Sequence, residues 1–304
     1  MSQSKFRLAA GLAVAAVLSA GTVSAADLPS PLPPPVANFG ALPAVDGING
    51  KIEAYGGDVS NISNFYGVGG SISAPLGRQF GVQFDGSLAS LNNTFVASGT
   101  AHAFWRDPGQ GLFGVFGQYN RWNDYGGVNL GRGGAEAALY RGQWTVEGVA
   151  GVEGGTNTTV LAFPILNTIN FQTRFYDQVD VAYYPVDNLK VYAGHLYSAG
   201  LNFGRLGAEW GMPFGGGKMT SVYAEGDLGA HGNNAVVAGL RIYFGQNDKS
   251  LLQRHREDDP PLVGGANYFA GGVTGGPTIV CAGSKPTTPR NSASCPLPTQ
   301  LPIK

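Results

Sequence analysis

The sequence predicts an all-β protein, a transmembrane antiparallel up-and-down β-barrel of about 12 strands. Three features indicate this fold: an export signal, strands in which apolar and polar residues alternate, and connections whose length depends on their parity along the chain. Charged residues make up 13% of the 304 residues, whereas about 25% is usual for a soluble protein. A barrel dilutes its apolar residues by alternation, so a low charge content suits it.

The N-terminus predicts a cleaved signal peptide at residues 1–26. Lys5 and Arg7 precede an uncharged run from Leu8 to Gly21, and small residues follow at 23–26. A run of about 14 residues is shorter than the roughly 20 that a membrane-spanning helix needs. Residues 27–47 are rich in proline, and we interpret them as an extended linker without a core of its own.

Residues 48–245 predict the barrel itself, with twelve strands and no amphipathic helix. Most of these strands are near ten residues long, which suits a tilted crossing of an outer membrane. The expected ranges are 50–57, 64–74, 79–88, 95–105, 111–119, 132–140, 144–153, 171–184, 189–198, 202–212, 219–228 and 235–245.

The last strand shows the alternation well. One face is wholly apolar, and the other holds Val237, Gly239, Arg241 and Tyr243. A soluble sandwich would bury the apolar face, whereas a membrane barrel turns it to lipid and encloses a polar lumen. The strands at 79–88, 144–153, 202–212 and 219–228 alternate in the same way, with many glycines on the polar face.

The connections favour the membrane barrel. Odd-numbered connections, counted from the first strand, are rich in Asn and Gly, and the longest is Gly154–Asn170. Even-numbered connections are mostly shorter and carry Pro or Gly suited to tight turns. A barrel with both termini in the periplasm predicts this difference, because its periplasmic turns are short and its outer loops longer.

Aromatic residues near strand ends are typical of interfacial girdles, although aromatic residues also favour strands in general. The residues expected at such girdles are Phe104, Trp105, Tyr140, Trp144, Tyr183, Tyr184, Trp210 and Phe244.

The end of the predicted barrel resembles the closing signal of bacterial outer-membrane barrels. Gly239 is followed by apolar Ile242 and aromatic Phe244, with Val237 where a polar residue is common. Residues 45–260, including Phe104-Trp105-Arg106-Asp107-Pro108 and Arg254-His255-Arg256-Glu257-Asp258-Asp259-Pro260, are similar to uncharacterised, porin-like alphaproteobacterial outer-membrane proteins. The resemblance implies an outer-membrane location in a Gram-negative bacterium and recognition by the barrel-assembly machinery. It implies no catalytic residue.

The polar faces supply candidate lumen-lining residues, whose charges must be solvated or paired. Strand register predicts two pairs, Lys190 with Glu209 and Glu53 with Arg241. Residues 51–241 hold 11 Lys and Arg and 14 Asp and Glu, a difference of −3 that permits a mild preference for cations. The candidates are Lys51, Glu53, Asp85, His102, Glu136, Glu147, Arg174, Asp180, Lys190, Arg205, Glu209, Glu225, Asp227 and Arg241.

Residues 246–304 are interpreted as a periplasmic tail, mostly disordered. Cys281 and Cys295 are the only cysteines. In an oxidising compartment they can form a disulfide, and free thiols are the alternative. Contact of the tail with peptidoglycan or a periplasmic partner is a further hypothesis.

No enzyme signature is present, and the sequence predicts no enzyme, cofactor or metal site. The four histidines are His102, His195, His231 and His255. His195 and Ser198 lie three residues apart on one strand, which places them on opposite faces. A protease-like Asp–His pair at the outer rim stays open as the less favoured hydrolase reading, because such pairs have no local motif.

The function favoured by the sequence is a porin-like passive channel for small solutes or ions, in contact with outer-membrane lipid and with no nucleic-acid partner. The main alternative is a structural or surface-recognition barrel with a sealed lumen and outward binding loops at Gly154–Asn170 and Asn120–Leu130. The two differ in whether the lumen conducts. The oligomeric state is left open.

Overall fold

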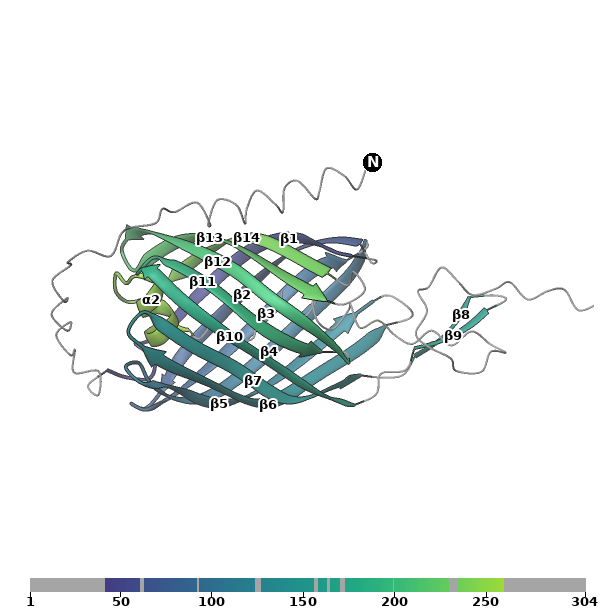
Figure 1. Ribbon diagram of the computed structural model, residues 1–304, viewed down its shortest axis with the longest axis horizontal. Coiled ribbons are helices and arrows are strands. Elements are labelled where there is room, and N and C mark those ends of the chain that lie inside the picture. Colours follow the sequence, from purple (N-terminus) through teal and green to yellow (C-terminus); the bar gives the residue numbers. More distant parts are fainter. Residues whose placement is uncertain are drawn as a thin grey trace, which may run out of the picture. The chain divides into compact units, whose positions relative to one another are not determined.

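The computed structural model describes residues 42–60, 63–91, 93–123, 127–155, 158–162, 165–169, 173–198, 200–229 and 234–259. Twelve strands form a closed antiparallel barrel in which each strand pairs with its neighbours along the chain (Figure 1). The barrel closes where the first strand, β1 (Asn49–Val59), pairs with the last, β14 (Asn234–Phe244). The predicted fold class is therefore confirmed.

All twelve predicted strands are present, most of them with bounds within a few residues of those expected. The longest connection also holds a hairpin of two short strands, β8 (Thr158–Ala162) and β9 (Ile165–Ile169), where we expected a loop only. The other ten strands of the barrel are β2 (Ser63–Leu76), β3 (Phe80–Leu91), β4 (Thr94–Asp107), β5 (Gly111–Trp122), β6 (Val128–Arg141), β7 (Trp144–Gly155), β10 (Arg174–Val186), β11 (Leu189–Ser198), β12 (Leu201–Gly215) and β13 (Lys218–Gly229).

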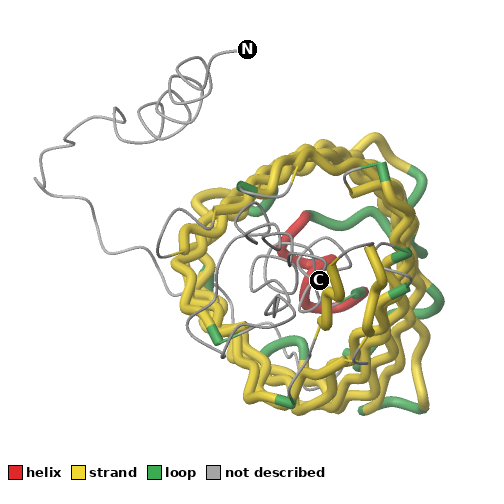
Figure 2. The backbone as a smooth tube through the Cα atoms, turned by 90° about the vertical axis from the view of Figure 1, so that its right-hand side faces the viewer, coloured by secondary structure: helices red, strands yellow, loops and turns green. Residues whose placement is uncertain are grey.

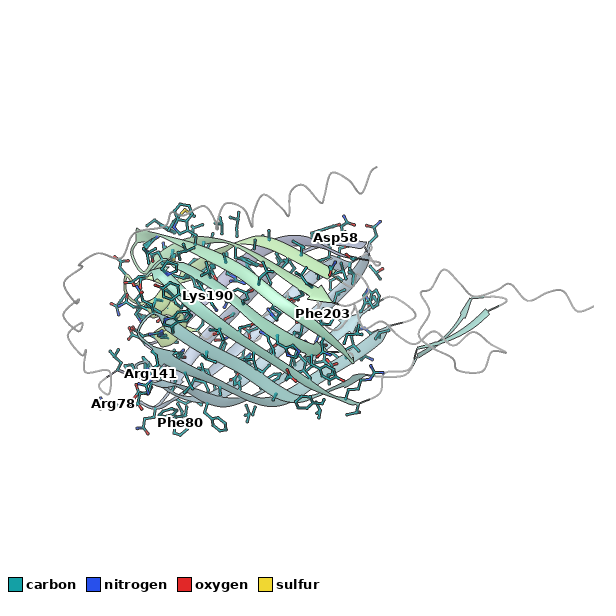
Figure 3. The ribbon with its side chains drawn as sticks, in the orientation of Figure 1. Asp58, Arg78, Phe80, Arg141, Lys190 and Phe203 are labelled. Carbon is teal, nitrogen blue, oxygen red and sulfur yellow. The ribbon has the colours of Figure 1, made fainter. Side chains whose placement is uncertain are left out.

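The two ends of the barrel differ as the parity of the connections predicts. At one end, here the turn end, successive strands are joined by only two or three residues. At the opposite end, the loop end, the connections run from two residues up to the span between β7 and β10. In Figure 3 Arg78 and Arg141 lie at the turn end and Asp58 at the loop end. Strand β1 begins at the turn end, and strand β14 ends there.

Alternation separates two faces of the wall. Large apolar side chains point outward and are exposed on every strand of the barrel except β11, as Phe80, Val115, Val152 and Leu240 do. Polar and charged side chains point inward, and many are buried. An apolar exterior around a polar interior is the reverse of a soluble barrel and is typical of a barrel that lies in lipid.

The prediction of a girdle position is wrong for three of the aromatic residues. Phe104, Tyr140 and Tyr184 are at most 3% exposed and face the lumen, because their even positions share the inward parity of their strands. Trp144 and Trp210 face outward near the turn end, and the Trp144 ring lies 4.6 Å from that of Tyr183. An outward aromatic girdle at the turn end therefore remains, with fewer members.

Lumen-facing glycines make room for tyrosine rings on the inner wall. Gly239 pairs in register with Tyr55 on one side and Tyr223 on the other, and a Cβ placed there would come within 2.7 Å of the Tyr223 ring. Gly207 has the same relation to Tyr192, with a separation of 2.5 Å. A crowded interior therefore requires glycine opposite each of these rings.

The described parts of both flanks, residues 42–48 and 245–259, pack against the barrel, although the sequence predicted a linker and a mostly disordered tail there. Ala44 and Val45 are fully buried, and the Ala44 N–H donates to the Arg78 carbonyl. After β14 the chain forms a short helix, α2 (Leu251–Gln253), which continues as a π-helical turn, η3 (Arg254–Asp258). Figure 2 shows these helical turns inside the ring of strands. Among the described residues, no helix is long and apolar enough to span a membrane.

Gly207→Ala is expected to destabilise the barrel by about 1–3 kcal/mol, because the new methyl group overlaps the Tyr192 ring. Gly204→Ala on the same strand is the matched control, since Gly204 faces outward into open space. Urea unfolding, followed by the gel shift between folded and heated protein, measures both. Equal midpoints for the two variants would contradict the packing described here.

Candidate functional site

The candidate site is the lumen, and its wall holds all of the predicted lumen-lining residues. Each occupies an inward-facing position of its strand, and most are buried. Arg174 shares the inward parity of Tyr176 at the loop end of β10. The residues are Lys51, Glu53, Asp85, His102, Glu136, Glu147, Arg174, Asp180, Lys190, Arg205, Glu209, Glu225, Asp227 and Arg241.

One predicted pair forms across the seam between β1 and β14. The Arg241 Nε atom lies 2.8 Å from Glu53 Oε2, and its Nη1 atom lies 2.7 Å from Glu209 Oε2. The same guanidinium lies 3.8 Å from the centroid of the Tyr223 ring. Arg241 thus joins β1, β12 and β14 inside the lumen.

The other predicted pair is wrong. Lys190 and Glu209 are neighbours in register, but Lys190 Nζ lies 2.7 Å from Glu147 Oε1 instead. Glu209 is already engaged by Arg241 and accepts hydrogen bonds from Ser221 and Tyr243. Strand β10 lies between β7 and β11, so this pair bridges across one strand inside the lumen.

Two further clusters in the lumen each place one basic side chain among several carboxylates. The guanidinium of Arg205 lies 3.2–3.5 Å from the carboxylates of Asp180, Glu225 and Asp227. His102 lies between two carboxylates, 2.9 Å from Asp85 Oδ2 and 2.8 Å from Glu136 Oε2. The contacts of Arg205 with Asp180 and of His102 with Glu136 each skip one strand, whereas the other contacts join adjacent strands, so each cluster connects three strands on the inner wall.

Nearer the loop end, Arg132 forms a contact network that the sequence analysis missed. Its Nη2 atom lies 3.1 Å from Glu153 Oε2 and donates to Ser198 Oγ at 2.7 Å. Ser198 also donates to Glu153. His195, three residues away, faces outward toward Asp177 and Asn202, so Ser198 and His195 do lie on opposite faces.

At the turn end, residues Lys249–Asp259 form a compact segment within the barrel, here called the plug. A capping box starts it: the Ser250 hydroxyl accepts from the Gln253 N–H, and the Gln253 side chain accepts from the Ser250 N–H. The N–H groups of Leu251 and Leu252 donate to the turn between β10 and β11, at Asn188 and Asp187. Leu251 is fully buried in an apolar cluster with Met219 and Tyr243.

The plug contacts strands all around the ring rather than one side of it. These contacts are mostly hydrogen bonds and ion pairs, and they reach β1, β2, β4, β7, β10, β14 and the turn between β12 and β13. They are Asp259–Lys51 (2.7 Å), Ser73 Oγ to the Asp258 carbonyl (3.0 Å), Arg106 Nη2 to the same carbonyl (3.0 Å), Arg256 Nη2 to the Trp144 carbonyl (3.0 Å), Tyr184–His255 (2.8 Å), Tyr243–His255 (3.3 Å) and Arg254 Nη2 to the Gly217 carbonyl (3.0 Å).

His255 lies at the centre of the aromatic contacts. Tyr184 lies 2.8 Å from its Nδ1 atom and Tyr243 lies 3.3 Å from its Nε2 atom. Tyr243 donates its own proton to Glu209, so the arrangement fits a neutral imidazole that accepts at Nδ1 and donates at Nε2. Burial lowers the pKa of His255 well below its usual value, which agrees with the neutral form.

Lys249 and Asp258 tie the plug to the N-terminal flank. Lys249 Nζ lies 2.6 Å from Asp258 Oδ1, 2.9 Å from Asp46 Oδ2 and 3.1 Å from Glu257 Oε2. Burial raises the pKa of Asp258 to about 6. The Asp46 N–H donates to the Glu257 carbonyl. The segment before β1 and the segment after β14 are therefore joined to each other at the turn end.

The plug was missed because a short polar segment after the last strand reads as a tail. One sequence signal was available: Ser250 and Gln253 have the spacing of a capping box. Gly239 faces the lumen, whereas Ile242 and Phe244 face outward, as the alternation requires. Cys281 and Cys295 lie outside the described residues. No cluster of three or more metal-ligating side chains is found within the described ranges.

Exchange of charge between Lys190 and Glu147 tests the observed pair against the predicted one. Lys190→Glu alone is expected to cost about 3–5 kcal/mol, because it leaves buried charges without a partner. The double variant with Glu147→Lys should regain most of that loss, whereas Lys190→Glu with Glu209→Lys should not. The urea midpoints of the refolded variants measure these effects. If Glu209→Lys rescues Lys190→Glu and Glu147→Lys does not, the Lys190–Glu147 pair is wrong.

The comparisons with known proteins point to no family. Neither a family profile nor a curated protein matches the chain. Solved structures that it resembles include an outer membrane channel from Pseudomonas putida F1 (13% identity, TM-score 0.46, covering 68% of this chain and 98% of that one). Others are the translocator domain of the autotransporter NalP from Neisseria meningitidis (13%, 0.45, 65% and 88%) and the transport unit of the autotransporter AIDA-I from Escherichia coli (9%, 0.43, 66% and 90%). Likenesses this distant carry no argument about function.

Proposed function

We propose that this protein is an outer-membrane β-barrel that acts as a porin-like channel for small solutes or ions, and that its plug is the gate. The observation that carries the proposal is the plug itself, which contacts strands around the whole ring at the turn end. A charged lumen provides the path, and the plug closes that path.

The chemistry of the contacts supports a gate rather than a permanent stopper. The plug is held mainly by ion pairs and hydrogen bonds, and Leu251 is its one fully buried apolar anchor. When such groups leave the wall, water replaces their partners, so the net cost per hydrogen bond is small. A plug with a large apolar face would lose far more free energy on leaving.

The surface and termini support the location. The exposed apolar belt fits lipid, and the export signal at residues 1–26 fits passage to an outer membrane. The short turns and both flanks of the barrel share one end, which we assign to the periplasm. The plug would then close the channel from the periplasmic side.

A sealed structural barrel is the second candidate, and the braced lumen favours it. The clusters around Arg205, Arg241 and His102 connect strands on the inner wall, and such bracing also suits a barrel that never conducts. The two candidates differ in what happens once the plug is gone.

Single-channel conductance of refolded protein in a planar bilayer tests the proposal. The full chain is expected to be mostly closed, and a variant without residues 246–304 is expected to show discrete ohmic openings. Arg254→Ala combined with His255→Ala should raise the open fraction of the full chain by tenfold or more, because it removes the contacts to Gly217, Tyr184 and Tyr243. In a salt gradient, openings should show a mild preference for cations.

Arg141→Ala is the control for these recordings, because Arg141 is the exposed last residue of β6 and is not part of the plug. Its open fraction should equal that of the unmodified chain. A truncated barrel that is folded, as judged by its gel shift on heating, but silent would refute the channel and leave the sealed barrel.

A further inference from the structure

The plug ends inside the lumen, and the chain has 45 further residues after Asp259. The Asp259 side chain is 2% exposed and pairs with Lys51 on the inner wall. Its backbone is extended, with φ −124° and ψ 122°. Pro260 and Pro261 follow, and proline prevents a helix from continuing there. Asp259 and the two prolines therefore favour an extended continuation from a point within the barrel.

Other groups occupy the space through which the chain after Asp259 would have to return to the turn end. Ala44 and Val45 are fully buried there, and Arg106 donates both to the Ala44 carbonyl and to the Asp258 carbonyl. Lys249 fills the space between Asp46 and Asp258. These contacts favour a continuation of the chain from Asp259 toward the loop end.

The wall on that path offers unpaired polar groups on β4 and β5. Gln118 and Asn120 are 4% and 1% exposed, and neither the oxygen nor the nitrogen of either amide has a partner among the described residues. The Thr100 hydroxyl, opposite Gln118 in register, is also unpaired. Buried amides require partners, and an extended backbone supplies both a donor and an acceptor at each residue.

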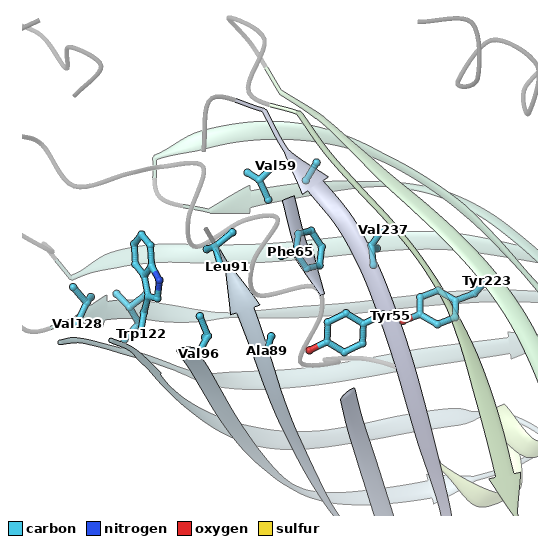
Figure 4. Packing of buried hydrophobic residues seen from close by; sticks show 12 residues of the cluster. Tyr55, Val59, Phe65, Ala89, Leu91, Val96, Trp122, Val128, Tyr223 and Val237 are labelled. Atoms are coloured by element: carbon cyan, nitrogen blue, oxygen red, sulfur yellow. The ribbon is translucent and has the colours of Figure 1, made fainter. Parts of the chain in front are cut away.

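Beyond these amides an apolar cluster lines part of the loop end of the lumen. A cluster of inward-facing side chains from β1 to β6, β13 and β14 lines it, including Val59, Leu91, Val96, Val128 and Val237 (Figure 4). The wall on this path therefore changes from amide-bearing to apolar between the plug and the loop end.

The sequence after Asp259 matches such a path. Residues 260–284 carry no charge, contain seven glycines, and include Leu262, Val263, Tyr268 and Phe269. From Lys51 to Val59 is a rise of about 26 Å along β1 at about 3.3 Å per residue. About nine extended residues cover that length, so the uncharged segment is long enough to cross and leave.

We propose that residues 260–284 cross the lumen of their own barrel along β4 and β5, so that the C-terminal part of the chain emerges at the loop end. The occupant of the lumen wall is thus this chain's own uncharged segment, which follows one side of the ring and leaves the rest of the lumen to the proposed channel. The consequence for the cell rests on the proposed orientation in the outer membrane: the C-terminus is displayed outside, although the chain enters the barrel from the periplasmic side.

Disulfide trapping tests the path independently of orientation and of conductance. In a chain with Cys281→Ser and Cys295→Ser, Gln118→Cys is combined in turn with a cysteine at Gly264, Gly265 or Ala266. At least one pair is expected to form an intramolecular disulfide in most molecules under mild oxidation. Tyr119→Cys is the matched control, since its side chain is the next one along β5 and faces outward; it should trap less than a tenth as much.

Absence of trapping at all three positions in a folded barrel, or equal trapping by Tyr119→Cys, would overturn the path and leave water or a solute as the partner of these amides. Conductance results do not enter this comparison. A silent truncated barrel would disprove the channel and leave the path standing, and absence of trapping would disprove the path and leave the channel standing.

Epitope tags on intact cells test the emergence. A tag after Lys304 should bind antibody on intact cells, whereas a tag inserted at residues 36–38 should bind only after the outer membrane is permeabilised. A C-terminal tag that is protected on intact cells would disprove surface display. Binding of the tag at residues 36–38 alone on intact cells would reverse the proposed orientation and leave the crossing in place. Binding of both tags on intact cells would put both ends of the chain on one side of the membrane and would contradict the crossing.

Discussion

Closure of the sheet between β1 and β14 is the constraint on which the structure depends. Every strand of a barrel in lipid must give its backbone N–H and C=O groups to two neighbours, because an open edge has no water to satisfy it. Here the ring closes in a register that pairs Gly50 with Phe244 and Val59 with Ala235. Once that register is set, the period of two along each strand decides which side chains meet lipid and which meet the interior.

The interior then has its own requirement. Charges enclosed by a wall cost free energy unless they are paired, and the wall supplies partners from adjacent strands and from strands two places away. Lys190 reaches past β10 to Glu147, Arg241 joins Glu53 to Glu209, and Arg205 gathers three carboxylates. The plug satisfies the same requirement at the turn end, because its basic and acidic side chains meet partners from the wall.

Much of this could be predicted, because a period of two is visible in the sequence itself. The twelve strands, the inward positions of the charged residues and the Glu53–Arg241 pair all follow from alternation and from closure of the ring. Partner choice across the lumen could not be predicted from register, since Lys190 contacts a strand two places away. Aromatic type and nearness to strand ends predict Tyr140 and Tyr184 in the girdle, whereas their parity along the strand turns them into the lumen.

The plug shows a different limit of prediction from the sequence. Its residues are polar, and their burial depends on a concave wall that exists only after the barrel has formed. Nothing local in Arg254-His255-Arg256 indicates burial, and only the capping box at Ser250 and Gln253 indicates a helix start. Composition alone therefore could not distinguish a solvated tail from a segment that is buried inside a charged barrel.

The contact between the two flanks bears on the order of assembly. The plug binds Lys51 and Ser73 on one side of the seam, and Tyr243 with Glu209 on the other, while Lys249 reaches Asp46 before β1. This set of partners is complete only after the first and last strands have joined, so the plug docks last. Docked, it adds bonds across the one interface whose rupture opens the ring, which slows unfolding at the seam.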